Sequence, residues 1–225
     1  MKAMKLKFYS LALAAGMLTL TACSDDNNDN NGDKGNEIEN GSTLKGTITE
    51  DVTLTAGSTY KLSGEYIVEA GATLNIEEGV KIISVYDNIV DYILVKQGAK
   101  INAVGTPDKP IIMTSEKEEP GAWGGIHICG KAHTNAEGGK GSSEIGGAVY
   151  GGNDDADNSG TLQYIRLEYT GFAFDEEHEA NGISFYGVGS GTIVDHCEAY
   201  KGSDDGFEFF GGSVNVSNMV VVSCS

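Results

Sequence analysis

Apolar and polar residues alternate along most of the chain after Leu44, and many of the apolar residues are β-branched. No stretch of about a dozen residues in this part has apolar residues at spacings of three and four, which an amphipathic helix would need. Alternation is typical of strands whose two faces have different surroundings. We therefore predict a domain made almost entirely of β-strands over residues 44–225.

The strand-like part of the chain contains repeats. When residues 66–76 are placed over residues 93–103, an offset of 27 residues, Val68 falls on Val95 and the glycines coincide. Three later segments share the order glycine, apolar, variable, apolar: 125–128, 182–185 and 206–209. A wider frame aligns further apolar positions, with its last two copies 22 residues apart: Leu162, Val194 and Val216, then Ile165, Cys197 and Met219, then Leu167, Ala199 and Val221.

Short strands that recur every 22 to 27 residues, with glycine at the corners, predict a solenoid. Its coils would stack at strand spacing, about 4.8 Å. A β-sandwich would instead need hairpin turns about every 8 to 12 residues, and such turns are scarce here. We therefore predict a parallel β-helix with the following residues inside: Leu74, Ile76, Ile101, Ile126, Ile128, Ile165, Leu167, Ile183, Phe185, Cys197, Ala199, Phe207, Phe209, Met219 and Val221.

Three segments carry a resemblance to a known family: residues 121–135 (GAWGGIHICGKAHTN), 150–171 and 181–212. They resemble a group of bacterial surface proteins, many of them lipoproteins, that has a right-handed parallel β-helix of the pectate-lyase type. The resemblance extends from about Gly46 to the end of the sequence. It implies an all-β, right-handed solenoid and no particular activity, because solenoids serve many functions.

The start of the chain has the order of a secretory leader. Basic residues precede an apolar run of about 13 residues at 8–20, shorter than the roughly 20 that a membrane-spanning helix needs. Residues 20–23 (Leu-Thr-Ala-Cys) resemble the lipobox of bacterial lipoproteins. We predict a signal peptide at residues 1–22 and lipidation of Cys23. The alternative is an ordinary secretory signal that happens to contain a cysteine.

Residues 23–43 contain the predicted lipidated cysteine and an acidic segment with almost no apolar residue to bury. We therefore predict a disordered tether. Acidic residues directly after the cysteine, here Asp25 and Asp26, resemble signals that send some Gram-negative lipoproteins to the outer surface. By this resemblance we expect a surface-exposed outer-membrane lipoprotein of a Gram-negative bacterium, held to the membrane by its lipid anchor.

The net charge of −18 and the isoelectric point near 4.4 exclude nucleic acid as an expected partner, because its phosphates would be repelled. In a β-helix the variable residue of each repeat points outward. His127, Ser184 and Glu208 should therefore share one external face. In pectate-lyase-like folds, as the resemblance implies, this face binds calcium and polygalacturonate.

The corner before Glu208 contains two further carboxylates, Asp204 and Asp205. Hard oxygen ligands suit calcium, so we predict that any bound metal is calcium at Asp204, Asp205 and Glu208. The alternative is that both aspartates cap backbone amides of the turn. Catalysis lacks support, since the pattern of a substrate clamp is missing and Arg166 is the single arginine.

Two other acidic segments, 153–158 and 175–179, are expected to be exposed turns or loops. The alternative for 153–158 is a calcium-binding loop, and the alternative for 175–179 is a ligand-binding loop. Three cysteines remain besides the lipobox cysteine. We expect Cys129, Cys197 and Cys224 to be small buried hydrophobic residues, with one disulfide as the alternative.

Three functions compete at this stage. The first is a cell-envelope lipoprotein whose acidic β-helical surface binds glycan or protein. The second is a polysaccharide lyase or glycoside hydrolase, and the third is a structural or adhesive surface protein. The apolar residues 219–225 have no polar cap after them, so we also expect the β-helix to be incomplete at its C-terminal end.

Overall fold

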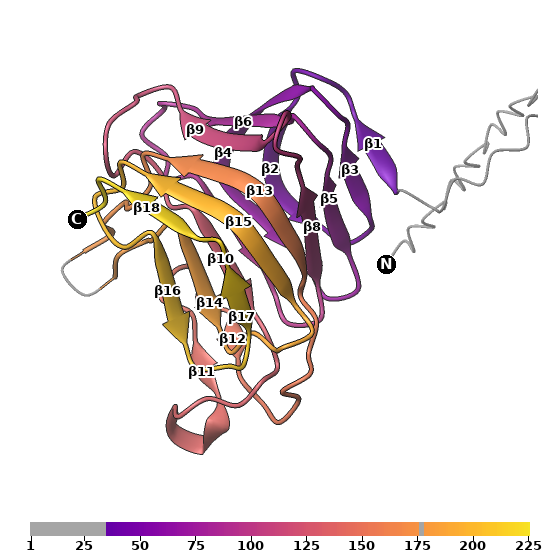
Figure 1. The fold of residues 1–225 in the computed structure, drawn as a ribbon, viewed down its shortest axis with the longest axis vertical. Helices are drawn as coiled ribbons and strands as arrows, with labels where there is room; N and C mark the ends of the chain where they lie inside the picture. The colour runs from indigo at the N-terminus through magenta and orange to yellow at the C-terminus, as the bar shows by residue number, and fades with distance from the viewer. Residues whose placement is uncertain (1–34, 176–177) are drawn as a thin grey trace, which may run out of the picture. The chain divides into compact units, whose positions relative to one another are not determined.

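The computed structural model describes residues 35–175 and 178–225, which form a parallel β-helix. Sixteen strands belong to one hydrogen-bonded system, and their pairs are parallel (Figure 1). The predicted leader, Cys23 and the tether up to residue 34 lie outside the described residues. No helix in the described part of the chain is long and apolar enough to cross a membrane.

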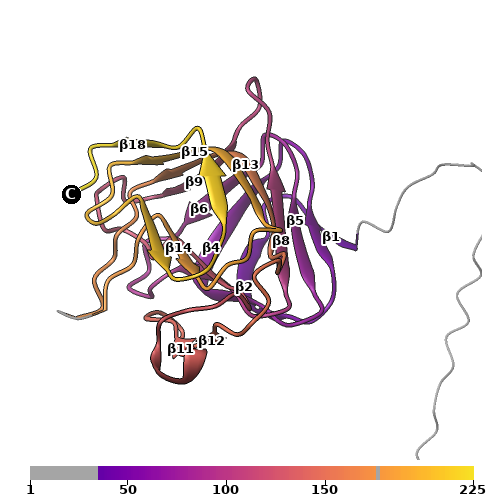
Figure 2. The ribbon, with the colours of Figure 1, turned by 60° about the horizontal axis from the view of Figure 1, so that its bottom comes forward.

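The strands stack in three sheets, which line three sides of the coils (Figure 2). The first sheet consists of β1 (Asn36–Ile38), β3 (Val52–Leu54), β5 (Thr73–Ile76), β8 (Lys100–Val104), β17 (Asn215–Ser217) and the first halves of β13 (Gly160–Glu168) and β15 (Ile193–Tyr200). The second consists of β6 (Lys81–Ser84), β9 (Ile111–Ser115), β18 (Val220–Val222), the first halves of β2 (Thr43–Ile48) and β4 (Thr59–Val68), and the second halves of β13 and β15. The third consists of the second halves of β2 and β4, β7 (Tyr92–Val95), β10 (Ile126–Cys129), β14 (Ile183–Tyr186) and β16 (Phe207–Phe210).

Long strands turn the corner between the first and second sheets. β13 and β15 bend at Tyr164 and His196, whose φ angles are 51° and 52°. Each residue lies one position before the register pair Ile165 and Cys197, so the two corners coincide in neighbouring coils. The Tyr164 and His196 rings stack with centroids 4.5 Å apart. This left-handed conformation is uncommon outside glycine, and its recurrence makes the corner a repeated feature of the coil.

The predicted register is confirmed. Val68 pairs with Val95 in the third sheet. Leu162 pairs with Val194, and Val194 pairs with Val216, in the first sheet. The repeats located these pairs because each coil must place an apolar side chain above that of the preceding coil.

Most of the predicted interior is confirmed as buried core. The last described coil differs, because Phe207 and Met219 are only partly buried and Phe209 and Val221 are 45% and 52% exposed. These four side chains have a coil packed against them on one side only. The prediction of full burial was therefore wrong for this coil.

The β-helix begins earlier in the sequence than predicted. Asn36–Ile38 forms β1, which pairs in parallel with β3, and the Gly41 amide donates to the carbonyl of Thr59 at 2.8 Å. Residues 36–43 thus belong to the first coil, and the tether prediction was wrong for them. Ile38 explains the difference, since it packs against the core although its neighbours are polar.

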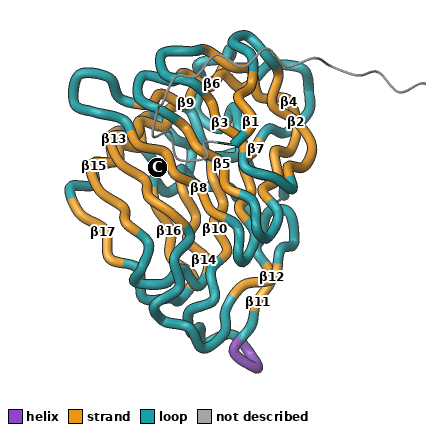
Figure 3. The backbone as a smooth tube through the Cα atoms, turned by 90° about the vertical axis from the view of Figure 1, so that its right-hand side faces the viewer, coloured by secondary structure: helices purple, strands orange, loops and turns teal. Residues whose placement is uncertain are grey.

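A long insertion interrupts the coils between β10 and β13. This covering segment, residues 131–159, contains one turn of 3₁₀ helix (Glu137–Gly139) and the antiparallel pair β11 (Gly141–Ser142) and β12 (Val149–Tyr150). Figure 3 shows the helix at the tip of this segment, away from the stacked coils. The segment packs against the outward side of the third sheet, which we call the site face.

Candidate functional site

The site face is built from register partners in consecutive coils. His127 pairs with Ser184 between β10 and β14, and Ser184 pairs with Glu208 between β14 and β16. The predicted row of three residues is therefore confirmed. Its predicted exposure is wrong for His127 and Ser184, which are fully buried, whereas Glu208 is half-buried.

The covering segment explains this burial. Ile145, Ala148 and Tyr150 pack against outward-pointing residues of the third sheet and form a second apolar core with them. The ring of Tyr150 lies 5.2 Å from that of Tyr186, centroid to centroid. The face that would be open in an uninterrupted β-helix is thus largely closed by the chain itself.

His127 is held as a neutral side chain inside this second core. Its Nε2–H donates to the Gly124 carbonyl at 2.8 Å, and its Nδ1 has no hydrogen-bond partner among the described residues. Burial lowers the pKa of His127 to about 4, because the charged imidazolium would be cut off from water. Neither a substrate nor bulk water can reach this ring in the closed arrangement.

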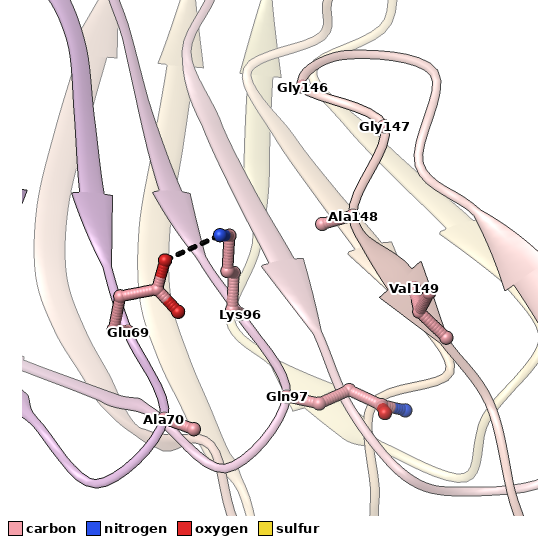
Figure 4. A pocket seen from close by; sticks show the side chains of 8 residues that line it. All are labelled: Glu69, Ala70, Lys96, Gln97, Gly146, Gly147, Ala148 and Val149. Atoms are coloured by element: carbon pink, nitrogen blue, oxygen red, sulfur yellow. Dashed lines mark hydrogen bonds and ion pairs between the residues drawn. The ribbon is translucent and has the colours of Figure 1, made fainter.

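A pocket of about 390 Å³ remains open at one end of the site face. On the sheet side, Glu69 follows β4 and Lys96 follows β7, and Lys96 Nζ lies 2.5 Å from Glu69 Oε1. Ala148 and Val149 of the covering segment form the opposite wall, and Gln97 extends from the sheet side (Figure 4). The pocket therefore combines an ammonium group, a carboxylate, a side-chain amide and an apolar wall.

Gln97 ties the two walls of the pocket together. Its Nε2 donates to the Gly130 carbonyl at 2.6 Å and to the Gly151 carbonyl at 2.8 Å. Glu69 and Lys96 are each about one-third exposed, so both charged groups can be reached from solvent. This pocket was missed in the sequence because Val149 and Ala148 belong to a segment that matches no repeat.

The corner before β16 carries the predicted calcium ligands. Asp204 Oδ1 accepts a hydrogen bond from the Asp205 amide at 2.7 Å, which is the turn-capping arrangement. Asp205 is exposed, and Glu208 Oε2 accepts a hydrogen bond from Asn181 Nδ2 at 2.5 Å. Within residues 35–175 and 178–225 no group of three or more histidine, cysteine or acidic side chains is arranged to hold a metal ion.

Two carboxylates act on this corner: Glu144, which the sequence did not single out, and Glu179, the last residue of the acidic segment 175–179 considered above as a binding loop. Glu144 comes from the covering segment, and Glu179 comes from the hairpin that precedes β14. A hydrogen bond with Asp204, and then the charge of Asp204, raise the pKa of Glu179. Burial and the charge of Asp204 raise the pKa of Glu144, although the charge of His178 lowers it. We call Glu144, Glu179, Asp204 and Glu208 the carboxylate cluster.

The acidic segment at 153–158 behaves as a capped turn. Asp155 Oδ1 accepts hydrogen bonds from the amide and from Nδ1 of His133, at 2.9 and 2.7 Å. Asp157 Oδ2 accepts from the Lys131 amide at 3.1 Å. These carboxylates thus fasten the two ends of the covering segment. In the other acidic segment, Glu176 and Glu177 lie outside the described residues.

The single arginine lies on another sheet. Arg166 Nε donates to Glu168 at 2.6 Å, its Nη1 donates to Glu198 at 3.1 Å, and its guanidinium lies over the Tyr200 ring. These residues belong to β13 and β15 in the second sheet. Arg166 is therefore engaged away from the site face.

The three described cysteines are free, so the disulfide alternative is not realised among them. Cys129 and Cys197 are buried, as predicted, and Cys224 is partly buried. Burial raises the pKa of the Cys129 and Cys197 thiols to about 12. Both remain protonated at neutral pH, and neither has the thiolate that a nucleophile needs.

Comparison with known proteins agrees with this geometry. A family model described as a pectate-lyase-like beta helix domain matches residues 46–225. The chain belongs to this family. No curated protein and no solved structure matches the chain. Membership in the pectate-lyase-like β-helix family confirms the fold implied by the sequence resemblance.

Within this pectate-lyase-like β-helix domain, the surface left for a ligand is set by the covering segment. The pocket beside Glu69 and Lys96 lies at one part of its edge, and the carboxylate cluster, to which Glu144 belongs, lies at another. Within the row, His127 and Ser184 are buried beneath the covering segment, and only Glu208 is partly exposed. The family alone assigns a role neither to the pocket nor to the cluster, because fold does not determine function.

Proposed function

We propose that this domain is the glycan-binding part of a cell-envelope lipoprotein and that it binds its glycan without cleaving it. The observation that carries the proposal is the pocket between the Glu69–Lys96 pair and the covering segment. Sugar hydroxyls both donate and accept hydrogen bonds, so a neighbouring carboxylate and ammonium serve them together. The apolar wall of Ala148 and Val149 suits the carbon–hydrogen face of a sugar ring.

The closed site face supports binding over catalysis. A lyase or glycoside hydrolase needs acid–base groups within hydrogen-bond reach of the substrate. His127 and Ser184 are buried beneath the covering segment, and Arg166 is paired on the second sheet. Polygalacturonate would also be repelled by a chain with a net charge of −18.

The location of the domain is part of the same proposal. Cys23 would carry the lipid, and the acidic segment after it would direct the protein to the surface of the outer membrane of a Gram-negative bacterium. An anionic membrane surface would repel so acidic a protein, and the acyl chains would therefore supply the attachment. The domain would then meet polysaccharides outside the cell.

A glycan array with matched variants tests the binding function. Wild-type protein should retain a set of oligosaccharides, and Lys96→Met should weaken each Kd about tenfold or more, since hydrogen bonds to charged groups contribute about 1.5–3 kcal/mol. Lys109→Met is the control, because Lys109 forms a similar ion pair with Glu78, at 2.7 Å, outside the pocket. Absence of any retained glycan, or equal losses in both variants, would overturn the proposal and favour a structural or adhesive role.

A further inference from the structure

A second pocket, of about 270 Å³, lies at the other end of the strands of the third sheet. We call it the loop pocket, because residues 85–90, the loop before β7, form one of its walls. Lys117 and Ala122 come from the segment before β10, and Phe172 comes from the segment before β14. Three successive coils therefore build this pocket, and none of its described lining residues belongs to the covering segment.

Hydrogen bonds hold the loop of this pocket in place. Asp87 Oδ2 accepts from Ser63 Oγ at 2.8 Å, and Asp87 Oδ1 accepts from the Ile89 amide at 3.1 Å. The Tyr86 amide donates to Glu116 Oε2 at 3.3 Å. A loop that is already ordered loses little conformational entropy when a ligand binds to it.

Large apolar side chains gather at the loop pocket without being covered. Tyr86 and Ile89 are 65% and 58% exposed, and the ammonium of Lys117 lies 5.4 Å from the centroid of the Tyr86 ring. Phe172 adds a partly buried ring, which packs edge-on against Phe174 at 5.0 Å, centroid to centroid. Exposed apolar groups that adjoin one another at a fixed pocket indicate a ligand with an apolar face.

The charged groups of the loop pocket are already engaged. Lys117 Nζ lies 3.1 Å from Glu119 Oε2, and the Asp87 carboxylate accepts the two hydrogen bonds given above. The Asn88 side chain, by contrast, is exposed and forms no hydrogen bond with any described residue. Its amide can both donate and accept, so the pocket favours an uncharged ligand that carries hydroxyl groups.

We propose that the loop pocket is a second glycan site, which binds one uncharged sugar ring. Tyr86 and Phe172 would supply the surface for the carbon–hydrogen face of the ring, and Asn88 would exchange hydrogen bonds with its hydroxyls. The volume lies near the lower end of small-molecule pockets, at about 300 Å³, and suits a single ring-sized group. The choice of a sugar over an apolar side chain of a partner protein rests on the proposed function, whereas the pocket itself does not.

Strand β7 runs between the two pockets, since Val90 before it lines the loop pocket and Lys96 after it lines the other. The strand rises about 3.3 Å per residue, so the two pockets lie about 20 Å apart. A disaccharide is too short to occupy both, and it should fill each site independently. A longer chain that reaches both sites gains avidity, and its retention on a glycan array therefore depends on both.

Methyl NMR separates the two sites, because Ile89 lines the loop pocket and Val149 lines the other. Cellobiose, lactose, xylobiose and mannobiose would each be titrated into protein with labelled isoleucine and valine methyl groups. In wild-type protein at least one of these sugars should shift both signals. Tyr86→Ala should weaken the Kd reported by Ile89 about tenfold or more and leave that reported by Val149 unchanged, and Lys96→Met should do the reverse.

Ile193→Ala is the control, because it shortens a side chain that is 52% exposed on the first sheet. Absence of any Ile89 shift with all four sugars would overturn the loop pocket, whatever Val149 reports, and so would equal weakening at Ile89 in Tyr86→Ala and Ile193→Ala. A shift at Ile89 with none at Val149 would support the loop pocket and contradict the pocket of the proposed function. N-acetylphenylalanine amide imitates an apolar side chain of a protein, and tighter binding of this compound than of every disaccharide at Ile89 would overturn the assignment to a sugar.

Discussion

His127 on β10 and Ser184 on β14 are register partners on the outward side of their sheet, yet neither side chain is exposed. An outward position in a solenoid normally faces water. Here the covering segment buries these positions beside a second core, and Ala148 of this core also lines the pocket beside Glu69 and Lys96 that we assign to a ligand. The properties of the covering segment are therefore the first to test.

Tyr150 should anchor the covering segment. It is buried against Tyr186, so Tyr150→Ala should lower the free energy of unfolding by about 3 kcal/mol in urea denaturation. The neighbouring Val149 is 54% exposed, and Val149→Ala should change the free energy of unfolding by less than about 0.5 kcal/mol. Equal effects of the two substitutions would mean that the segment does not pack as described.

Asp91 should make stability depend on pH. It is buried, its Oδ1 accepts from the Gly64 amide at 2.5 Å, and its Oδ2 has no partner among the described residues. Burial raises the pKa of Asp91 from 3.8 to about 6, so the folded protein keeps a proton that the unfolded chain has lost between these values. Stability contributed by this group therefore falls as pH rises from about 4 to 6, by up to about 3 kcal/mol.

His127 acts in the opposite direction. Its pKa is lowered from 6.5 to about 4, so the unfolded chain takes up a proton that the folded protein does not, and stability rises with pH across that range. The two effects offset each other in wild-type protein. Asp91→Asn should remove the Asp91 effect and leave that of His127. The Tm of this variant should therefore rise more steeply with pH than that of wild type between about pH 4 and 6. Parallel Tm profiles would contradict the burial of Asp91.

Phe185 and Phe209 occupy one interior column in consecutive coils, with stacked rings 5.0 Å apart. Phe185 is fully buried, so Phe185→Ala should cost about 4 kcal/mol in unfolding free energy. Phe209 is 45% exposed, and Phe209→Ala should cost less than about 2 kcal/mol. A larger cost at Phe209 would show that another part of the protein covers the last described coil.

Cys23 should attach the protein to the membrane. Cys23→Ser removes the thiol that the lipid would modify, so the variant should leave the membrane fraction or stay unprocessed. Fractionation followed by gel mobility measures both results. A variant that remains in the membrane fraction with unchanged mobility would contradict lipidation.

The sequence was sufficient to predict the coils but not the covering of the site face. Val68 and Val95 could be aligned because the stacking of coils requires a repeated apolar side chain. Ile145 and Tyr150 match no repeat. The sequence around them therefore does not reveal that they pack against the third sheet. For the same reason Glu144 could not be placed beside Asp204, since their proximity depends on the fold of the covering segment.

The proposal that this domain binds glycan without cleaving it can be tested in one assay. The glycans retained on the array would be incubated in solution with purified protein, and both retention and new sugar ends would be measured. We predict retention by wild-type protein, loss of retention in Lys96→Met, and no new ends in either sample. Release of new reducing or unsaturated ends by wild-type protein would contradict the account, as would a failure to retain any glycan.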